Sequence, residues 1–507
     1  MGRCLATSRE NDAVYVAGNI GDSTLLLKVD LTGKLIWSRV IDAIPAENEV
    51  PSGIVADADG MIAVVGTGRD QIMGGTLYAF RYNPDTHTIL WSHEYTHSPN
   101  DYALGMIEKG NGGNYLLTNQ PTYWAQSMQL AEVVEMDKTT GMIITSFSKN
   151  YRDHETETLF DLVFYENFVY GIGRYKNGGS VGTFRNTLVK LDPNTGDQLW
   201  VRMGHVPASG TARLYGYDLA IADNSIFSVC SGDPSGTSTS ARKLFIQRTA
   251  VNGNLIWIKQ YELPGANDIS QDLIQSGNGL IAFTYDQITG RNFLFKIDFE
   301  GNVLWAKTFE FPNLILTTEE LRSNTVLVQA GDRLVFTGFG INSTGDADVL
   351  VVQTDLDGNV QSPCVESQSI SLTAQTVNNP AWYEQSPEQF DVEFQTNDNS
   401  PESRATLIPI SQECAVADTV FSTIEASICE GESYEGYTAT GVYEDYFFTM
   451  AGCDSVRILE LTVNQCDSTC STTTGAVYGT SGENEYGYSL AATPGQDGFY
   501  VAGRRED

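Results

Sequence analysis

A short segment recurs along this chain at a nearly fixed interval. In each copy an apolar run ends at Asp or Asn, a tight turn follows, and a second apolar run ends in tryptophan, as in DLTGKLIW at 30–37. Asp and Asn side chains bond to nearby backbone groups and Gly accepts a positive φ, so each copy predicts a β-hairpin. The clearest copies end at Trp37, Trp91, Trp200, Trp257 and Trp305.

The spacing of these hairpins predicts the architecture. Weaker copies place Thr145 and Ser362 at the tryptophan position, so seven anchors follow one another at intervals of 48 to 57 residues. Each interval also holds earlier runs with β-strand alternation, such as AVYVAG at 13–18, and none has a helical pattern. Four short strands in each of seven repeats predict an all-β chain with a seven-bladed β-propeller at 1–362, in which one large Trp pins each unit.

The repeat stops after the seventh copy, and the composition changes there. Between 365 and 470 the only basic residues are Arg404 and Arg457. We therefore expect a small β module at 363–420, a second β module at 421–465, and a linker with the first part of another repeat array at 466–507. The last segment is predicted because 486–503 align without gaps to 1–18. A chain that ends inside a blade also predicts that both ends are truncated.

Charge and cysteine content limit the class of protein. The chain has 64 acidic and 30 basic residues, a net charge of −34, which argues against nucleic acid and anionic membrane surfaces as partners. No apolar run has the roughly 18 residues needed to insert into a membrane. Six of the eight cysteines lie between 364 and 470, and such a cluster predicts disulfides and an extracellular or cell-surface location. We expect a Cys429–Cys453 bond; the other candidate pairs are Cys364 with Cys414 and Cys466 with Cys470.

Two segments resemble known families. The pattern CEGESY…GCDS…LTV at 429–463 is similar to a short module of large secreted surface proteins of Bacteroidetes, and this resemblance implies export by the type IX route. The DPNTGDQLW-type hairpins resemble PQQ-like (quinoprotein-type) propeller repeats, a likeness that concerns the fold. Quinone chemistry is not expected, because the sequence has no adjacent Cys pair, no haem-attachment motif, and seven repeats where the quinoprotein dehydrogenases usually have eight.

Two motifs could bind metal. HEYTH at 93–97 matches a zinc-peptidase pattern, but it follows Trp91 in a predicted strand, where residues four apart are about 13 Å apart, so zinc is not expected. The turns VADADG at 55–60 and DLDG at 355–358 place carboxylates at alternate positions, which makes Asp57, Asp59, Asp355 and Asp357 candidate calcium ligands. Neither turn continues to a bidentate Glu, so Asx-supported hairpin turns are favoured and no other cofactor is expected.

Without a catalytic motif, the sequence favours a non-catalytic extracellular or cell-surface protein that binds a glycan or protein, or builds part of the envelope. The polar loops at 173–185 and 231–242 are the expected binding loops. One alternative is an enzyme at the propeller mouth, either a hydrolase or a quinoprotein-like oxidoreductase; another is a passive spacer. Carboxylates that converge at the central channel would favour the enzyme, and a channel mouth of Gly, Ser and Thr would favour the binding protein.

Overall fold

In the residues that it describes, the computed structural model of this protein has β-strands and no helices. The described residues cover most of 2–405, with the longest gaps at 177–183, 207–212, 234–241 and 318–325; beyond them they comprise 420–429, 440–448, 454–464, 484–492 and 499–506. The chain divides into two units, Met1–Ala417 and Asp418–Asp507.

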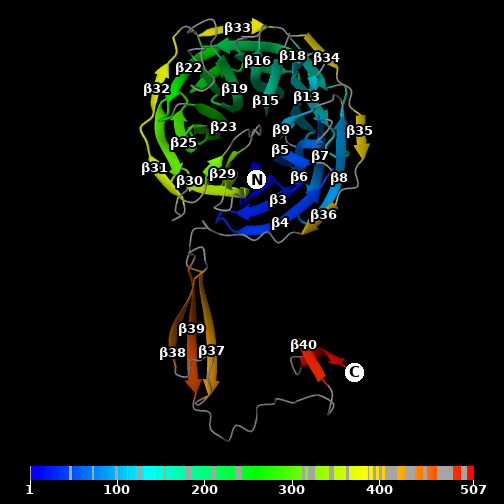
Figure 1. Ribbon diagram of the computed structural model, residues 1–507, viewed down its shortest axis with the longest axis vertical. Helices are drawn as coiled ribbons and strands as arrows, with labels where there is room; N and C mark the ends of the chain where they lie inside the picture. The colour runs from blue at the N-terminus through cyan, green and yellow to red at the C-terminus, as the bar shows by residue number, and fades with distance from the viewer. Residues whose placement is uncertain are drawn as a thin grey trace. The chain divides into compact units, whose positions relative to one another are not determined.

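The first unit is a seven-bladed β-propeller, which confirms the predicted fold (Figure 1). Blades 1 to 3 comprise β1 (Gly2–Thr7), β2 (Ala13–Ile20), β3 (Ser23–Asp30), β4 (Leu35–Asp42); β5 (Asn48–Ala56), β6 (Ile62–Asp70), β7 (Gly74–Asn83), β8 (Thr88–Thr96); β9 (Ala103–Glu108), β10 (Tyr115–Asn119), β13 (Ala131–Met136), β14 (Lys149–Arg152). Blades 4 to 6 comprise β15 (Thr156–Tyr165), β16 (Phe168–Lys176), β17 (Phe184–Leu191), β18 (Gln198–His205); β19 (Arg213–Ala222), β20 (Ser225–Asp233), β21 (Lys243–Ala250), β22 (Leu255–Glu262); β23 (Asp268–Ser276), β24 (Gly279–Asp286), β25 (Arg291–Asp298), β26 (Val303–Glu310). Blade 7 contains β28 (Leu327–Ala330), β29 (Arg333–Ile341) and β30 (Ala347–Asp355), with β27 (Ile315–Thr317) on β29; β11 (Thr122–Tyr123) and β12 (Met128–Gln129) extend the sheet of blade 4.

The first strand of each blade lies nearest the central axis, and successive first strands contact one another around the ring (Figure 1). The hydrophobic core is therefore divided among the seams between neighbouring blades. At the seam of blades 6 and 7, for example, the rings of Phe283 and Phe336 lie 4.9 Å apart. Each seam has apolar side chains from two sheets, because alternate residues of a strand point to opposite faces.

The repeated tryptophans lie at these seams, each against the next blade. The Trp91 indole donates its Nε1–H to the carbonyl of Lys138, 3.0 Å away in the hairpin turn of blade 3. A Cβ on Gly301 would lie 2.9 Å from the Trp257 ring, and both Gly301 and Gly358 have positive φ. The recurring Gly–x₃–Trp pattern thus has two causes: a left-handed turn residue, and an indole from the preceding blade packed over it.

The strands after blade 7 form a belt around the propeller, and the belt runs through the blades in reverse order. It comprises β31 on blade 6, β32 on blade 5, β33 on blade 4, β34 on blade 3, β35 on blade 2 and β36 on blade 1. Every belt strand pairs antiparallel with the outermost strand of its blade, as Figure 1 shows at the rim. The bounds are β31 (Glu366–Ser369), β32 (Thr373–Thr376), β33 (Ala381–Gln385), β34 (Glu388–Asp391), β35 (Gln395–Asp398) and β36 (Glu402–Ala405).

This belt replaces the separate β module expected at 363–420. Its strands begin every seven or eight residues, and about seven extended residues reach roughly 23 Å, enough to step from one blade edge to the next. The inner side of the belt is apolar: Ile370 and Leu372 pack on the core between blades 5 and 6, and Trp382 packs between blades 4 and 5. The segment is too short and too polar for a core of its own, so its apolar residues are buried against the blades.

The second unit contains two small sheets. The first has the order β37 (Val420–Cys429), β39 (Asp454–Asn464), β38 (Gly441–Phe448), with β37 and β39 parallel. The second is the hairpin of β40 (Asn484–Ala492) and β41 (Phe499–Glu506). Gly487 pairs with Gly503 next to a bulge, as Gly2 pairs with Gly18 in blade 1. The ungapped sequence alignment of the two segments therefore corresponds to one hairpin geometry.

Candidate functional site

Three consecutive blades carry an aspartate at the same place in their innermost strand. Asp161 in β15, Asp218 in β19 and Asp272 in β23 each follow a β-bulge, where the register shifts by one residue. A bulge leaves one residue unpaired and redirects the next side chain. The recurrence places three carboxyl groups on neighbouring innermost strands of the ring.

Each of these carboxyl groups bonds to the next blade. Asp272 Oδ2 accepts the backbone N–H groups of Val326 and Leu327, at 2.7 and 2.8 Å. Asp218 Oδ2 accepts the N–H of Leu273, and Asp161 accepts that of Leu219. The three aspartates thus connect blades 4, 5, 6 and 7 through polar contacts at the channel.

The three carboxyl groups also hydrogen-bond to one another, with Asp218 between Asp161 and Asp272. Two ionised carboxylates cannot hydrogen-bond, so at least one member of this carboxyl chain holds a proton. Burial raises the pKa of Asp161 to about 6 and that of Asp272 to about 7, and burial together with its two neighbours raises the pKa of Asp218 well above its usual range. Asp218 and Asp272 are 4% and 2% exposed, and Asp161 is the least buried residue of the three.

These pKa values predict that the propeller is more stable in mild acid. In the folded state these aspartates keep protons that they release near pH 3.8 when the chain is unfolded. The resulting stabilisation is complete below that pH and is lost as pH rises through about 6 to 7. We expect the melting temperature to fall between pH 5 and pH 8, corresponding to a few kcal/mol. Thermal melts followed by circular dichroism measure this. An equally steep fall in Asp218→Asn would show that other groups cause it.

A second cluster lies beside the carboxyl chain, at the seam of blades 4 and 5. We call it the arginine–aromatic cluster; its members are Phe160, Arg174, Phe184, Arg213, Tyr215, Tyr217 and Arg242. The Arg174 guanidinium lies 5.4 Å from the Phe160 ring and 5.9 Å from the Phe184 ring, and that of Arg242 lies 5.2 Å from the Tyr215 ring. Such distances fit cation–π contacts.

The bulges join the cluster to the carboxyl chain. Phe160 and Tyr217 are the unpaired bulge residues directly before Asp161 and Asp218, and their rings stack at 5.3 Å. Arg242 Nη1 donates to the Tyr217 hydroxyl at 3.4 Å. Burial raises the pKa of Tyr215, and the guanidinium groups of Arg242, Arg213 and Arg174 oppose that rise.

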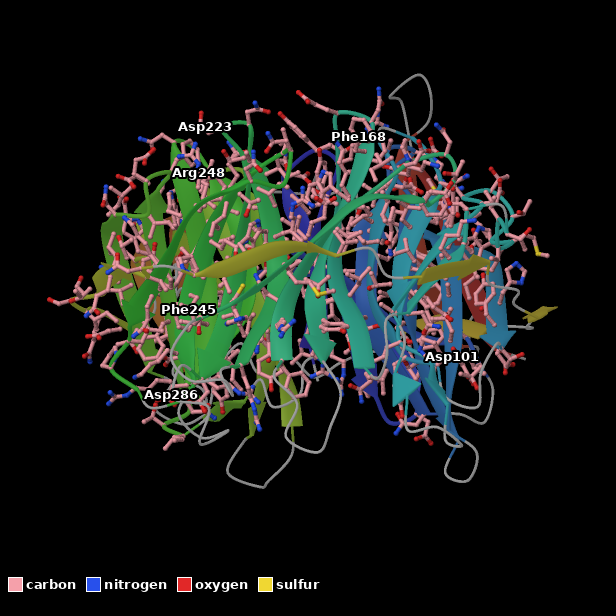
Figure 2. The ribbon with its side chains drawn as sticks, turned by 90° about the horizontal axis from the view of Figure 1, so that it is seen from above. Asp101, Phe168, Asp223, Phe245, Arg248 and Asp286 are labelled. Carbon is pink, nitrogen blue, oxygen red and sulfur yellow. The ribbon has the colours of Figure 1, made fainter. Side chains whose placement is uncertain are left out.

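The cluster lies toward one face of the ring. Arg213 pairs with Asp233 as Asp268 pairs with Asp286 in the next blade, so all four positions belong to the face where first strands begin. Figure 2 shows Asp286 and Asp101 on that face of the propeller, and Asp223 and Arg248 on the opposite face. Arg174, Phe184 and Arg242 fall within the two loops that the sequence predicts as binding loops, 173–185 and 231–242.

The carboxyl chain has a signal in the sequence that the motifs considered above do not include. It is the recurrence of FDL, YDL and QDL at 160–162, 217–219 and 271–273, one blade apart. The aromatic contacts have no comparable signal, since they depend on how two blades pack together.

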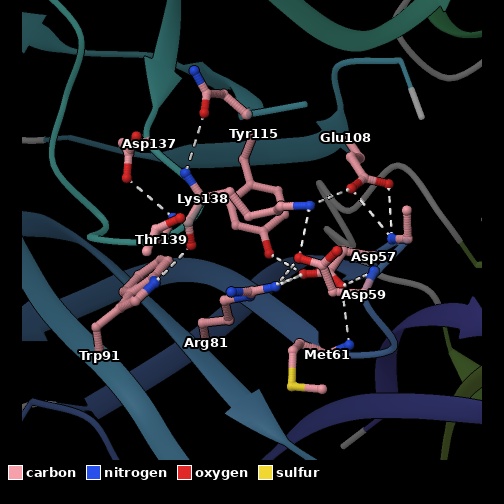
Figure 3. Close-up of polar contacts among 12 residues, drawn as sticks. Asp57, Asp59, Met61, Arg81, Trp91, Glu108, Tyr115, Asp137, Lys138 and Thr139 are labelled. Carbon is pink, nitrogen blue, oxygen red and sulfur yellow. Dashed lines mark hydrogen bonds and ion pairs between the residues drawn. The ribbon is translucent and has the colours of Figure 1, made fainter. Parts of the chain in front are cut away.

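The candidate calcium ligands Asp57 and Asp59 lie in an ion-pair network that joins blades 2 and 3 (Figure 3). Asp57 Oδ2 lies 2.7 Å from Arg81 and accepts the Tyr115 hydroxyl, while its Oδ1 accepts the N–H groups of Asp59 and Met61 at 2.9 Å. Asp59 pairs with Arg81 at 2.8 Å and Lys138 at 2.9 Å. Protein cations thus already neutralise both carboxylates.

The remaining predicted residues lie in structural surroundings or outside the described part. Asp355 accepts the N–H of Asp357 at 3.0 Å in an Asx-supported turn. His93 lies in strand β8, stacks on Trp91 at 5.6 Å and bonds to the carbonyl of Thr140. The cysteines of the predicted disulfides all lie outside the described residues or side chains; they are Cys364, Cys414, Cys429, Cys453, Cys466 and Cys470. Cys4 and Cys230 are buried cysteines that form no disulfide.

Comparison with known proteins finds no matching family model and no matching curated protein. Several solved structures are similar. The GH93 α-L-arabinofuranosidase of Fusarium graminearum has 11% identity and a TM-score of 0.36, covering 61% of this chain and 93% of its own. The Penicillium chrysogenum α-L-arabinanase has 11% identity and a TM-score of 0.40, covering 62% and 95%. The Dos1 propeller has 10% identity and a TM-score of 0.39, covering 69% and 77%.

These comparisons contradict the expectation of a non-catalytic protein, because glycosidases recur among the similar structures. The three aspartates of the innermost strands lie together, but two of them are buried between blades. The likeness itself shows the fold alone, so an activity has to be argued from this chain's own residues. In the described part of the chain no helix could cross a bilayer. The extracellular location, the PQQ-like and Bacteroidetes resemblances, and the glycan or protein partner stay predictions.

Proposed function

We propose that this propeller is a hydrolase of glycosidic bonds and that Asp161 is its proton-transferring catalytic residue. The observation that carries the proposal is the carboxyl chain, three hydrogen-bonded carboxyl groups on the innermost strands. A structural role as a blade connector accounts for the backbone bonds of these groups. It does not account for a run of three carboxyls that must share protons in a buried site.

The chemistry follows from the properties of Asp161. Glycosidic bonds break when a carboxylic acid protonates the leaving oxygen, and a group with a pKa near the working pH does this best. Burial raises the pKa of Asp161 to about 6, and Asp161 is the most exposed of the three aspartates. Asp161 gives its proton to the leaving oxygen as the C–O bond breaks. Water then supplies hydroxide to the sugar carbon and a proton that restores Asp161.

The two buried members hold Asp161 in place. Asp218 donates to Asp161 and is itself bonded to Asp272, so the Asp161 carboxyl keeps one orientation throughout the cycle. Asp218 and Asp272 raise the affinity of the carboxyl chain for protons. A proton therefore stays bound at neutral pH and is available to Asp161. Asp218 and Asp272 are positioning residues in this scheme.

The test is a screen of the purified chain against chromogenic aryl glycosides and soluble polysaccharides, with release of reducing ends as the readout. In Asp161→Asn we expect kcat to fall by about 10²- to 10⁴-fold in a protein that is still folded at the assay temperature, the usual contribution of a general acid. The exposed Asp12→Asn is the matched control and should keep full activity. A wild-type protein that cleaves none of these substrates, or an Asp161→Asn variant with unaltered kcat, rejects the proposal.

A further inference from the structure

We propose that the arginine–aromatic cluster binds an anionic sugar, which makes the substrate an acidic glycan; this inference rests on the proposed function for its catalytic part. The starting observation is charge. In a chain of net charge −34, the guanidinium groups of Arg174 and Arg242 lie over the Tyr215 ring at the seam of blades 4 and 5, and that of Arg213 lies over the adjacent Phe184 ring. Like charges repel, so the neighbouring Arg213 and Arg242 are stabilised by an anion.

Three buried or half-buried arginines of the propeller have acidic partners. Arg81 pairs with Asp57 at 2.7 Å, Arg248 with Asp223 at 2.6 Å, and Arg202 with Glu384 at 3.2 Å. No described carboxylate forms an ion pair with Arg213 or Arg242, whose printed contacts are with aromatic rings and the Tyr217 hydroxyl. Both side chains are partly exposed, so a dissolved anion can reach them.

The rings determine which anion fits. Phe184 and Tyr215 lie 4.9 Å apart, and Phe160 and Tyr217 are stacked at 5.3 Å. Phe184 and Tyr217 are partly exposed. The apolar face of a sugar ring can stack on such an aromatic ring, and the tyrosine also has a polar hydroxyl at its edge. Guanidinium forks bind carboxylate or sulfate groups in two-point contacts. A sugar that carries such a group would use both features, whereas a free inorganic anion uses only the arginines.

The cluster is also correctly placed relative to Asp161. Tyr217 directly precedes Asp218 in its strand, so a sugar on the partly exposed Tyr217 ring lies next to the carboxyl chain. The acidic ring is then one sugar unit of the substrate, and the glycosidic bond beside it is the one presented to Asp161. The strong negative charge elsewhere repels long polyanions, which favours chains in which acidic sugars are spaced apart.

The test measures binding separately from hydrolysis. The Asp161→Asn protein is titrated by calorimetry with a tetra-uronate, with a sulfated oligosaccharide of equal length and with the neutral parent oligosaccharide. We expect binding of at least one anionic probe and at least 10-fold weaker binding of the neutral one. Arg213→Ala and Arg242→Ala should each weaken anionic binding by about 10- to 100-fold, as loss of a charge-assisted hydrogen bond does.

The control is Arg9→Ala, an exposed arginine elsewhere on the propeller, which should bind as the parent does. Preference for the uronate or for the sulfated probe identifies which acidic group the site takes. Equal binding of neutral and anionic probes, or unchanged binding in both arginine variants, overturns the inference while the hydrolase proposal stands. Binding with the expected selectivity by a wild-type protein that cleaves nothing supports the site and rejects the hydrolase proposal.

Discussion

Deleting residues 366–405 is expected to lower the melting temperature of the propeller by about 10 °C or more, or to leave it aggregated. The belt pairs with the outermost strands of six blades, which would otherwise present free backbone groups along their edges. Net hydrogen-bond contributions of about 1 kcal/mol each are largely offset by the entropy of ordering the segment. The surplus comes from apolar contacts.

Those contacts set the size of the effect. Ile370, Leu372, Val377 and Trp382 pack on seam clusters, and each fully buried side chain of this kind contributes roughly 1.5–3 kcal/mol. These four side chains are partly buried, so their loss should lower the free energy of unfolding by about 5 kcal/mol in all. A change of 1 kcal/mol shifts the melting temperature by about 2–4 °C. Differential scanning calorimetry gives the value. Trp382→Ala should show part of the loss and the exposed Gln368→Ala none; a deletion that melts like the full chain would mean the belt is dispensable.

The second large effect is expected at Glu49, which connects blades 1 and 2. This buried carboxyl accepts the N–H groups of Thr24 at 3.0 Å and Ile44 at 2.8 Å, that of Ala43, and the Thr24 hydroxyl. Burial raises its pKa to about 7. In Glu49→Ala the buried donors lose their acceptor, and such losses destabilise by about 3–5 kcal/mol.

Urea unfolding curves measure this loss of stability. Glu49→Gln keeps one acceptor oxygen and should give an intermediate loss, while Glu10→Ala, at an exposed acidic position in the same propeller, should unfold as the parent does. If Glu49→Ala and Glu10→Ala unfold at the same urea concentration, the blade 1–2 seam does not depend on the carboxyl.

The periodic parts of the fold follow from the sequence. The hairpin with its turn Gly and its Trp could be recognised from local chemistry, because turn conformation and strand alternation depend on residues close in the chain. Counting the copies gave the number of blades. The alignment of 486–503 with 1–18 also predicted a shared hairpin, which both segments adopt with a bulge at the same place.

Only the tertiary structure decided the belt and the site. The belt strands are four or five residues long and largely polar, so nothing in them distinguishes pairing with each other from pairing with six different blades. Asp161, Asp218 and Asp272 are more than 50 residues apart in sequence and become neighbours because consecutive first strands line one channel. Local sequence determines which strands and turns form; closing them into a ring determines which distant carboxyl and guanidinium groups share one site.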